Sequence, residues 1–211
     1  MSMSIYIFIG LVVFIAAWSI ASYLAVLRIE TPSYTVLKKE PGYEIRKYEA
    51  YLIAQTQVTG SLDEASRKGF RVIADYIFGN NLSRDKISMT APVVEQRSQK
   101  IAMTAPVINT LEDSNTRTIS FILPSKYTLD TLPEPNNPQV TITAVPQHTV
   151  AALRFTWYPT ATRIDQKKAK LTALLAQDNQ TTTGTIQVAR YNPPLSMPLL
   201  LRNEILIPIQ E

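Results

Sequence analysis

The sequence contains no cysteine and, among its 211 residues, a single histidine. The absence of cysteine excludes disulfides, thiolate metal sites and thiol nucleophiles. With His148 alone, a metal site has almost no side-chain ligands to draw on, and bis-histidine ligation within one chain is impossible. The sequence also lacks a glycine-rich phosphate loop, a Gly-x-Ser-x-Gly elbow and a His-Glu-x-x-His motif. We therefore expect a protein that is not an enzyme.

A long basic run is missing as well. Lys and Arg number 21 against 17 Asp and Glu, which gives a net charge of +4, and they are scattered along the chain. A protein that reads nucleic acid usually has a denser basic stripe with aromatic platforms. We therefore expect no nucleic-acid partner.

By contrast, residues 4–27 form an uncharged run rich in Ile, Val, Leu, Phe and Ala. A helix of this length measures about 36 Å, which is enough to cross a bilayer. Signal peptides normally begin with a basic segment, which residues 1–4 do not contain. Trp18 and Tyr23 suit the membrane interface. The sequence thus predicts an N-terminal transmembrane anchor over residues 1–29, with a cleaved signal peptide as the alternative.

The orientation of this anchor is indicated by the charges that flank it. Five basic residues follow the span, namely Arg28, Lys38, Lys39, Arg46 and Lys47. The positive-inside rule therefore favours a single-pass protein whose domain lies in the cytoplasm. A periplasmic or external domain stays open, because a short N-terminal tail is easily translocated and exported bacterial domains hang from similar anchors.

Residues 30–211 are predicted to form one domain. Alternating apolar and polar residues predict strands at 34–39, 43–47, 51–58 and 118–123. Between them, Ser61 and Glu64 have the spacing of a capping box, and apolar residues then recur at intervals of three and four. A helix is therefore expected to begin at Ser61 and to end at Gly79.

The second half of the domain repeats this order. Strands are predicted at 140–145, 150–157, 185–190 and 204–209. A helix is expected near 162–177, with Thr162 and Asp165 at capping spacing. The predicted fold is therefore α+β, built from two degenerate ββαββ repeats. Two such units close most simply into one antiparallel barrel-like sheet with both helices packed outside.

An eight-residue phrase occurs twice, fourteen positions apart: Lys86-Ile-Ser-Met-Thr-Ala-Pro-Val93 and Lys100-Ile-Ala-Met-Thr-Ala-Pro-Val107. Its alternating pattern predicts two strands that pair as a hairpin, with each proline at an edge, bulge or strand end. Met89 and Met103 are then either core residues or the lining of a flat apolar ligand site. A role for either as an iron ligand is a further possibility.

This phrase resembles the signature of the SOUL haem-binding protein family. Residues 133–138, 191–194 and 202–208 are also similar to that family in their order and spacing. The resemblance covers the chain from Glu30 onward and implies a SOUL-type haem-binding domain with the barrel-like architecture. Bacterial effector-binding domains that hold apolar cationic molecules share that architecture, so fold and function separate here.

The first helix carries the second candidate site. Its arginines flank an apolar stripe, and guanidinium groups suit the carboxylates at the edge of a tetrapyrrole. Relatives in the family are thought to use a cleft by this helix, although any surface helix shows charges beside an apolar stripe. The expected haem-binding residues are Arg67, Phe70, Arg71, Ile73, Ala74, Ile77, Met89 and Met103. His148 is expected in an exposed turn.

The resemblance implies a membrane-anchored protein that binds haem or another tetrapyrrole reversibly in an apolar cleft, for carrying or buffering it. Three alternatives stay open. One is an effector-binding module for another flat hydrophobic molecule. The others are a non-catalytic interaction domain at the membrane and an enzyme that acts on metallated porphyrins.

Overall fold

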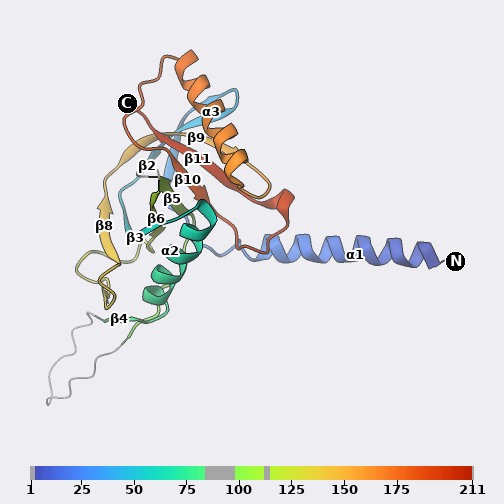
Figure 1. The fold of residues 1–211 in the computed structure, drawn as a ribbon, viewed down its shortest axis with the longest axis horizontal. Helices are drawn as coiled ribbons and strands as arrows, with labels where there is room; N and C mark the ends of the chain where they lie inside the picture. The colour runs from blue at the N-terminus through green and yellow to red at the C-terminus, as the bar shows by residue number, and fades with distance from the viewer. Residues whose placement is uncertain (1–2, 84–97, 112–114, 211) are drawn as a thin grey trace.

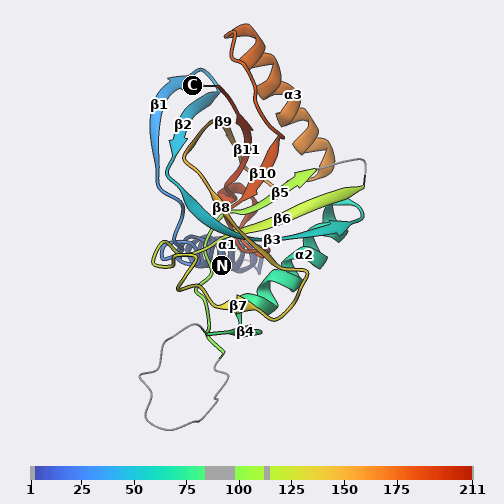
Figure 2. The ribbon, with the colours of Figure 1, turned by 90° about the vertical axis from the view of Figure 1, so that its left-hand side faces the viewer.

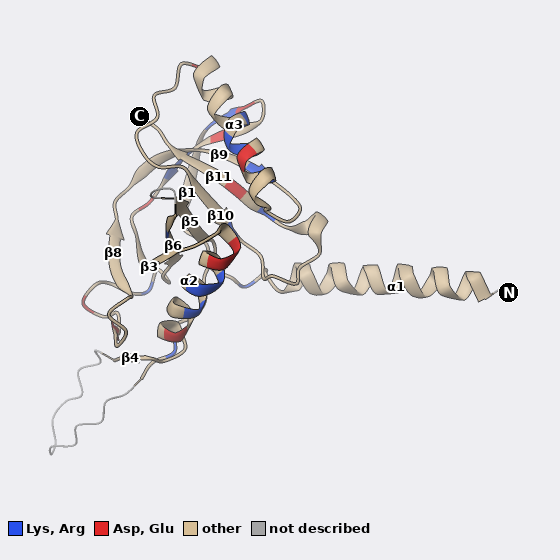
Figure 3. Ribbon diagram, viewed as in Figure 1, with Lys and Arg blue, Asp and Glu red and all other residues tan. Residues whose placement is uncertain are grey.

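The computed structural model describes residues 3–83, 98–111 and 115–210. Helix α1 (Met3–Leu24) projects away from a curled sheet, which carries two further helices (Figure 1). In Figure 3, α1 shows no charged residue along its whole length. It is long and apolar enough to cross a membrane, although an N-terminal signal sequence has the same character.

Nine strands form one antiparallel sheet in the order β1-β2-β9-β11-β10-β5-β6-β3-β8. Their bounds are β1 (Tyr34–Glu40), β2 (Tyr43–Tyr48), β3 (Tyr51–Thr59), β5 (Val107–Leu111), β6 (Thr116–Ile122), β8 (Thr141–Val145), β9 (His148–Phe155), β10 (Gln187–Arg190) and β11 (Asn203–Pro208). A small ribbon pairs β4 (Asn81–Leu82) with β7 (Glu134–Pro135). Figure 2 shows how the large sheet curls, with both helices on its outer face.

The strand order is symmetric about the central β5–β10 pair. Outward from β5 come β6, β3 and β8, and outward from β10 come β11, β9 and β2. Helices α2 (Leu62–Ile77) and α3 (Ala161–Gln177) follow β3 and β9 in the chain. The units β2-β3-α2-β5-β6 and β8-β9-α3-β10-β11 therefore occupy equivalent places, and the first strand of each unit pairs within the other half of the sheet. This arrangement confirms the predicted ββαββ duplication, with β1 added at one edge.

Helix α2 (Leu62–Ile77) begins and ends where the sequence predicts. The Ser61 hydroxyl accepts a hydrogen bond from the Glu64 N–H at 3.4 Å, and Gly79 follows the helix at φ +126°. The buried face packs on β3 and β6. At its closest point, a Cβ on Gly69 would lie 2.4 Å from Cγ1 of Ile119. This close approach explains a glycine in the middle of a helix.

Helix α3 (Ala161–Gln177) begins at a different cap from the predicted one. The hydroxyl of Thr160, not that of Thr162, accepts the hydrogen bond from the Arg163 N–H at 3.4 Å. The predicted cap is wrong because Thr160 already has the extended backbone of a cap residue and Thr162 lies within the first turn. Ile164, Leu171 and Leu175 are buried against the sheet, as the apolar spacing predicts.

The second copy of the repeated phrase is not the predicted strand, apart from Val107, which opens β5. Ala102 and Met103 are both exposed, and the next two residues, Thr104 and Ala105, are both buried, so the side chains do not alternate between two faces. The backbone of this copy pairs with other elements instead. The Ile101 N–H donates to the carbonyl of Ile77 at 2.9 Å, and the Ala105 N–H donates to that of Glu30 at 2.9 Å.

The expected position of a proline at the end of a strand is confirmed for Pro106, which directly precedes β5. The first copy of the phrase, with Met89, lies outside the described residues. Of the two strands predicted for the hairpin, the second copy is therefore not a strand before Val107, and the first copy cannot be compared.

A fully buried carboxylate, that of Glu204 in β11, joins several strands. Its Oε2 accepts hydrogen bonds from Nη1 of Arg46 and from the hydroxyl of Tyr191, both at 2.8 Å. Its Oε1 accepts from Nε of Arg202 at 3.0 Å. The Arg46 guanidinium also lies over the ring of Tyr34, 4.6 Å from its centre. The cluster therefore links β1, β2 and β11 with the residue that follows β10.

Ionisation of Glu204 is favoured within this cluster. Burial alone would raise the pKa of the Glu204 carboxyl, but the charges of Arg46 and Arg202 hold it below its ordinary value. Burial and the neighbouring carboxylate raise the pKa of the Tyr191 hydroxyl, so this group stays protonated and donates a hydrogen bond to Glu204. The folded state therefore contains a charged glutamate bound by three donor groups.

We expect Glu204→Gln to lower the free energy of unfolding by about 3–5 kcal/mol, because it removes the buried carboxylate and leaves Arg46 only its partly exposed partner Glu44. The lowered pKa makes this contribution complete at neutral pH and progressively lost as the pH falls through the folded-state pKa of Glu204. Wild-type stability should therefore fall more steeply in acid than that of the variant. Urea unfolding of the detergent-solubilised chain at neutral and acidic pH measures both effects.

Glu44→Gln is the matched control, because the Glu44 side chain also pairs with Arg46, at 2.8 Å, but is 31% exposed. We expect it to cost less than about 1 kcal/mol. Equal losses for the two variants would contradict a special role for the buried carboxylate.

Gly69→Ala should destabilise the protein by about 1–3 kcal/mol through the clash with Ile119, although alanine favours a helix. Gly184→Ala serves as the control, because its new Cβ would lie 3.2 Å from the nearest atom, in Pro208. Thermal unfolding compares the two variants. A control that is destabilised as much as Gly69→Ala would count against the close contact between α2 and β6.

Candidate functional site

The predicted haem-binding residues of α2 fall into two groups. Ile73, Ala74 and Ile77 are buried and pack toward the sheet. Arg67 and Arg71 are exposed. Figure 3 shows the middle of α2 in blue, with red at both ends, so the basic residues occupy the centre of the helix. The buried group forms core contacts, and only the outer group faces solvent.

Phe70 lies between these two groups. Its side chain is 38% exposed, and its ring lies 5.3 Å from the buried ring of Phe121 in β6. Arg67, Phe70 and Arg71 share one face of the helix because they are three and four residues apart. Met103 is exposed on the connector that precedes β5, which corrects its interpretation as a core residue. Met89 lies outside the described residues.

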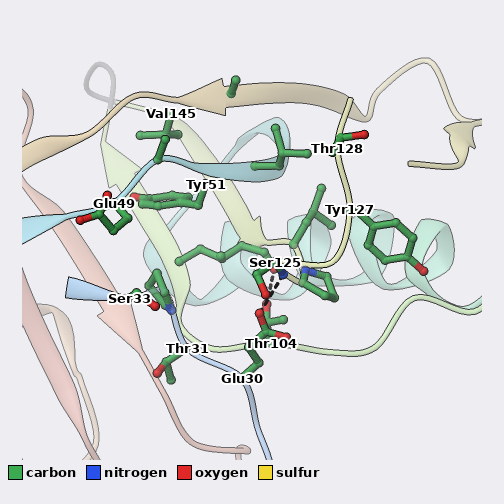
Figure 4. Close-up of a pocket in the computed structure, with 17 residues that line it drawn as sticks. Glu30, Thr31, Ser33, Glu49, Tyr51, Thr104, Ser125, Tyr127, Thr128 and Val145 are labelled. Atoms are coloured by element: carbon green, nitrogen blue, oxygen red, sulfur yellow. Dashed lines mark hydrogen bonds between the residues drawn. The ribbon is translucent and has the colours of Figure 1, made fainter. Parts of the chain in front are cut away.

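A cavity of about 610 Å³ opens where β3 begins and where β6 and β8 end (Figure 4). Its walls come from segments that are far apart in the sequence. They are residues 30–33, 49–52, 122–125, 127–128 and 144–145, together with Thr104. The volume lies within the range of about 300–1,000 Å³ that is typical of small-molecule sites.

The lining of this cavity is mixed, with Leu52, Leu123 and Tyr51 beside several serines and threonines. Among the residues that the structure describes, the lining includes two carboxylates and no lysine or arginine. Oε1 of Glu30 accepts a hydrogen bond from the Ser125 N–H at 2.7 Å, whereas Glu49 lies on the opposite side in Figure 4. Burial, and to a lesser extent a neighbouring tyrosine, raises the pKa of the Tyr51 hydroxyl to about 12, so it is protonated at neutral pH.

The repeated phrase forms part of the cavity wall through Thr104. The Thr104 hydroxyl donates to the carbonyl of Ile122, and its backbone forms a bridge with Glu30. The phrase therefore ties the segment that follows α1 to the end of β6. Sequence reasoning missed the cavity because no pattern pairs residues 30–33 with residues 122–128. The phrase itself was the one signal that pointed there.

His148 is not in an exposed turn, as the sequence predicts, but begins β9 and is half-buried. Its ring stacks on Tyr48 with a centre-to-centre distance of 5.7 Å and meets the edge of Tyr51 at 5.8 Å. Nδ1 lies 2.8 Å from the carbonyl of Pro146. The histidine therefore lies one side chain away from the cavity, behind Tyr51.

A second cavity, of about 410 Å³, lies beside the Glu204 cluster. Its lining includes Arg46 and Arg202, which are held by Glu204, and the exposed Arg154. Because two of its cations already pair with a buried carboxylate, we assign this region a structural role. In the part of the chain that the structure describes, no group of three or more Asp, Glu or His residues could hold a metal ion.

Sequence comparison relates the chain to proteins of known name. A family model described as "SOUL heme-binding protein" matches residues 29–100 and 94–208, two stretches that overlap at residues 94–100. The human protein named "Heme-binding protein 2" is 30% identical over 181 residues, which cover 83% of each chain. "Heme-binding protein 1" of Xenopus laevis is 28% identical over 170 residues, covering 78% of this chain and 82% of its own.

Solved structures share the fold at low sequence identity. The EcmrR C-terminal domain is 8% identical with a TM-score of 0.59 and covers 84% of this chain and 98% of its own. A protein from Listeria innocua described as a hydrolase is 9% identical with a TM-score of 0.53, covering 82% and 94%. These likenesses show the fold alone. The matched family model and the human relative decide the family: the chain belongs to the SOUL haem-binding protein family.

Proposed function

We propose that this protein binds haem or another tetrapyrrole reversibly and non-covalently at a membrane surface, for carrying or buffering it. The observation that carries the proposal is the family match, which extends over almost all of the chain outside α1. Two relatives that match most of the chain are named as heme-binding proteins.

The cavity beside Tyr51 is the place we propose for the macrocycle. It is concave, has a suitable volume and is lined by aliphatic and aromatic side chains, which favour an apolar disc. Tyr51 is a candidate axial ligand, since tyrosine phenolate binds haem iron in some proteins. The ammonium of Lys126 lies 4.8 Å from the ring centre of Tyr127, a lining residue, and offers a cation near the cavity for a propionate.

Membrane attachment through α1 forms the second part of the proposal. The helix ends at Leu24, and Glu30 already belongs to the cavity wall. Six extended residues span at most about 20 Å, so the cavity stays close to the membrane surface. Free haem partitions into lipid, and a tethered acceptor would meet it there. The basic residues after α1 favour a cytoplasmic domain.

The exposed face of α2 is the competing location for haem. It offers two guanidinium groups for the propionates, from Arg67 and Arg71, with Phe70 between them as an apolar surface. It is convex, however, and its buried neighbours Ile73 and Ile77 are taken up by core contacts. Variants at the two sites separate these locations.

A second candidate function is the binding of a flat lipophilic cation. Glu30 and Glu49 belong to the cavity lining, which contains no lysine or arginine. A carboxylate within a partly apolar cavity favours a positive ligand through charge attraction at low dielectric. The acidic lining is the observation that favours this alternative.

Haemin titration of the full chain in lipid nanodiscs should saturate near one haem per chain, followed by the Soret band and by tryptophan quenching. Ala144→Phe, which places a ring in the cavity from the exposed side of β8, should weaken haemin binding at least about tenfold. Thr141→Phe, at an exposed position of the same strand outside the cavity lining, is the control. Binding that never saturates would overturn the proposal.

The double variant Arg67→Ala/Arg71→Ala tests the competing location in the same titration. We expect a change of less than about twofold, because neither arginine lines the cavity. A large loss in this variant, with Ala144→Phe unaffected, would move the site to α2. Tyr51→Phe should shift the Soret maximum of the complex if the phenol ligates iron.

Tetraphenylphosphonium titration tests the cationic alternative. If the acidic lining selects cations, this probe should bind saturably, and Glu49→Gln should weaken its binding several-fold while haemin binding stays unchanged. Isothermal calorimetry compares the two probes. Saturable binding of the phosphonium together with non-saturable haemin binding would favour the second function over the first.

A further inference from the structure

The turn before β11 is bound to the last turns of α1. Nε1 of Trp18 donates a hydrogen bond to the carbonyl of Leu195 at 2.9 Å, and the N–H of Met197 donates to the hydroxyl of Ser22 at 2.8 Å. Ser22 is buried, although most of α1 is exposed. In Figure 1 the red turn that contains η1 (Pro198–Leu200) lies beside the end of α1. These two bonds hold the turn beside residues 18–22 of the helix.

The turn therefore lies beside the helix itself and not beyond its end. Trp18 comes six residues before the end of the helix at Leu24, which corresponds to a rise of about 9 Å. The interfacial layer on each side of a bilayer core is about 5–7 Å thick. If α1 crosses a membrane, the segment beside Trp18 therefore reaches the headgroup layer and the start of the hydrocarbon.

The surface of this turn is apolar. Leu195 is 86% exposed, and Leu199 and Leu200 are 55% and 44% exposed. Three exposed leucines within six residues are unusual on a water-facing turn, because each leaves apolar area in contact with solvent. The three leucines lie beside the apolar helix α1, and contact with lipid would remove their exposed apolar area from water.

A second turn, between β9 and α3, adds two aromatic residues to this surface. Trp157 and Tyr158 are 47% and 46% exposed. The Trp157 N–H donates to the carbonyl of Pro198 at 2.9 Å, and Nδ2 of Asn203 donates to the Trp157 carbonyl at 2.9 Å. The second turn is thereby fastened to the first.

The backbone of Trp157 has a φ of +71°, in the left-handed region that bulky residues rarely adopt. Such a conformation costs free energy and persists only where surrounding bonds hold it, often at functional positions. Here it holds an exposed indole at the end of the domain from which α1 projects. Tryptophan and tyrosine are the residues that favour the membrane interface.

We propose that Leu195, Leu199, Leu200, Trp157 and Tyr158 form an apolar collar that inserts into the headgroup layer of a phospholipid bilayer beside α1. The inference rests on the membrane attachment in the proposed function and extends it. The hydrogen bonds to Trp18 and Ser22 already hold the first turn against the end of α1. The collar adds a second contact and holds the domain at one tilt, with Arg163 near anionic headgroups because its Nη1 donates to the Tyr158 carbonyl at 2.5 Å.

The two tryptophans of the chain provide separate reporters for the helix and the collar. Trp157→Phe leaves Trp18 to report on α1, and Trp18→Phe leaves Trp157 to report on the collar. Each full-length variant is reconstituted in phosphatidylcholine–phosphatidylglycerol vesicles that contain lipids brominated at shallow or deep acyl positions. Fluorescence quenching then gives the depth of each indole.

We expect quenching of both indoles, with Trp157 quenched at least twofold more by shallow than by deep bromine. Quenching of Trp18 without quenching of Trp157 would overturn the collar and leave the membrane attachment standing. No quenching of either indole would overturn the attachment, and the collar with it.

Leucine variants in the Trp18→Phe background test the collar without altering its reporter. Leu199→Asp/Leu200→Asp should reduce the shallow quenching of Trp157 by at least half, because two charges oppose insertion. Leu37→Asp, at a 48% exposed position in β1, is the control and should leave the quenching unchanged. An equal effect of control and collar variants would also contradict the proposal.

Discussion

The buried carboxylate of Glu204 is the interaction on which the second half of the sheet depends. It accepts hydrogen bonds from Arg46, Arg202 and Tyr191, and so holds strands that are far apart in the sequence. Removing one partner from such a group leaves an uncompensated buried charge, which costs far more than losing a surface pair. Arg46 and Arg202 also line the smaller cavity, and because Glu204 already binds both, we assign that cavity a structural role. Among the described residues, no such ion pair occupies the lining of the other cavity, beside Tyr51, which is the place that we propose for the ligand.

The duplicated architecture explains how the chain builds a concave site. The β5–β10 pair lies at the centre of the sheet, and each unit completes the half formed by the other. The helices cover the outer face, as Figure 2 shows, so the apolar residues Ile73 and Ile77 of α2 serve the core. The ends of β3, β6 and β8 stay open and meet the linker from α1. Proximity to that linker places the cavity next to the membrane if α1 spans it.

Much of the fold could be predicted from local chemistry, whereas the site could not. The Ser61 cap and the Gly79 stop gave the correct bounds of α2, and matching patterns in the two halves gave the ββαββ duplication. The cap of α3 was misplaced because Thr160 and Thr162 both offer a hydroxyl near the helix start. The phrase with Met103 alternates as a strand does, yet tertiary bonds to Ile77 and Glu30 decide its path. Cavity walls formed by distant segments leave no periodic signal in a sequence.

The most direct test of haem binding in the cavity is the location of iron in crystals of the protein grown with haemin, from its anomalous scattering. Our account predicts one iron site within the cavity, near the hydroxyl of Tyr51. An iron site over the outer face of α2, between Arg67 and Arg71, would contradict the proposed location while preserving haem binding. Crystals grown at saturating haemin that show no ordered iron would contradict the central claim itself.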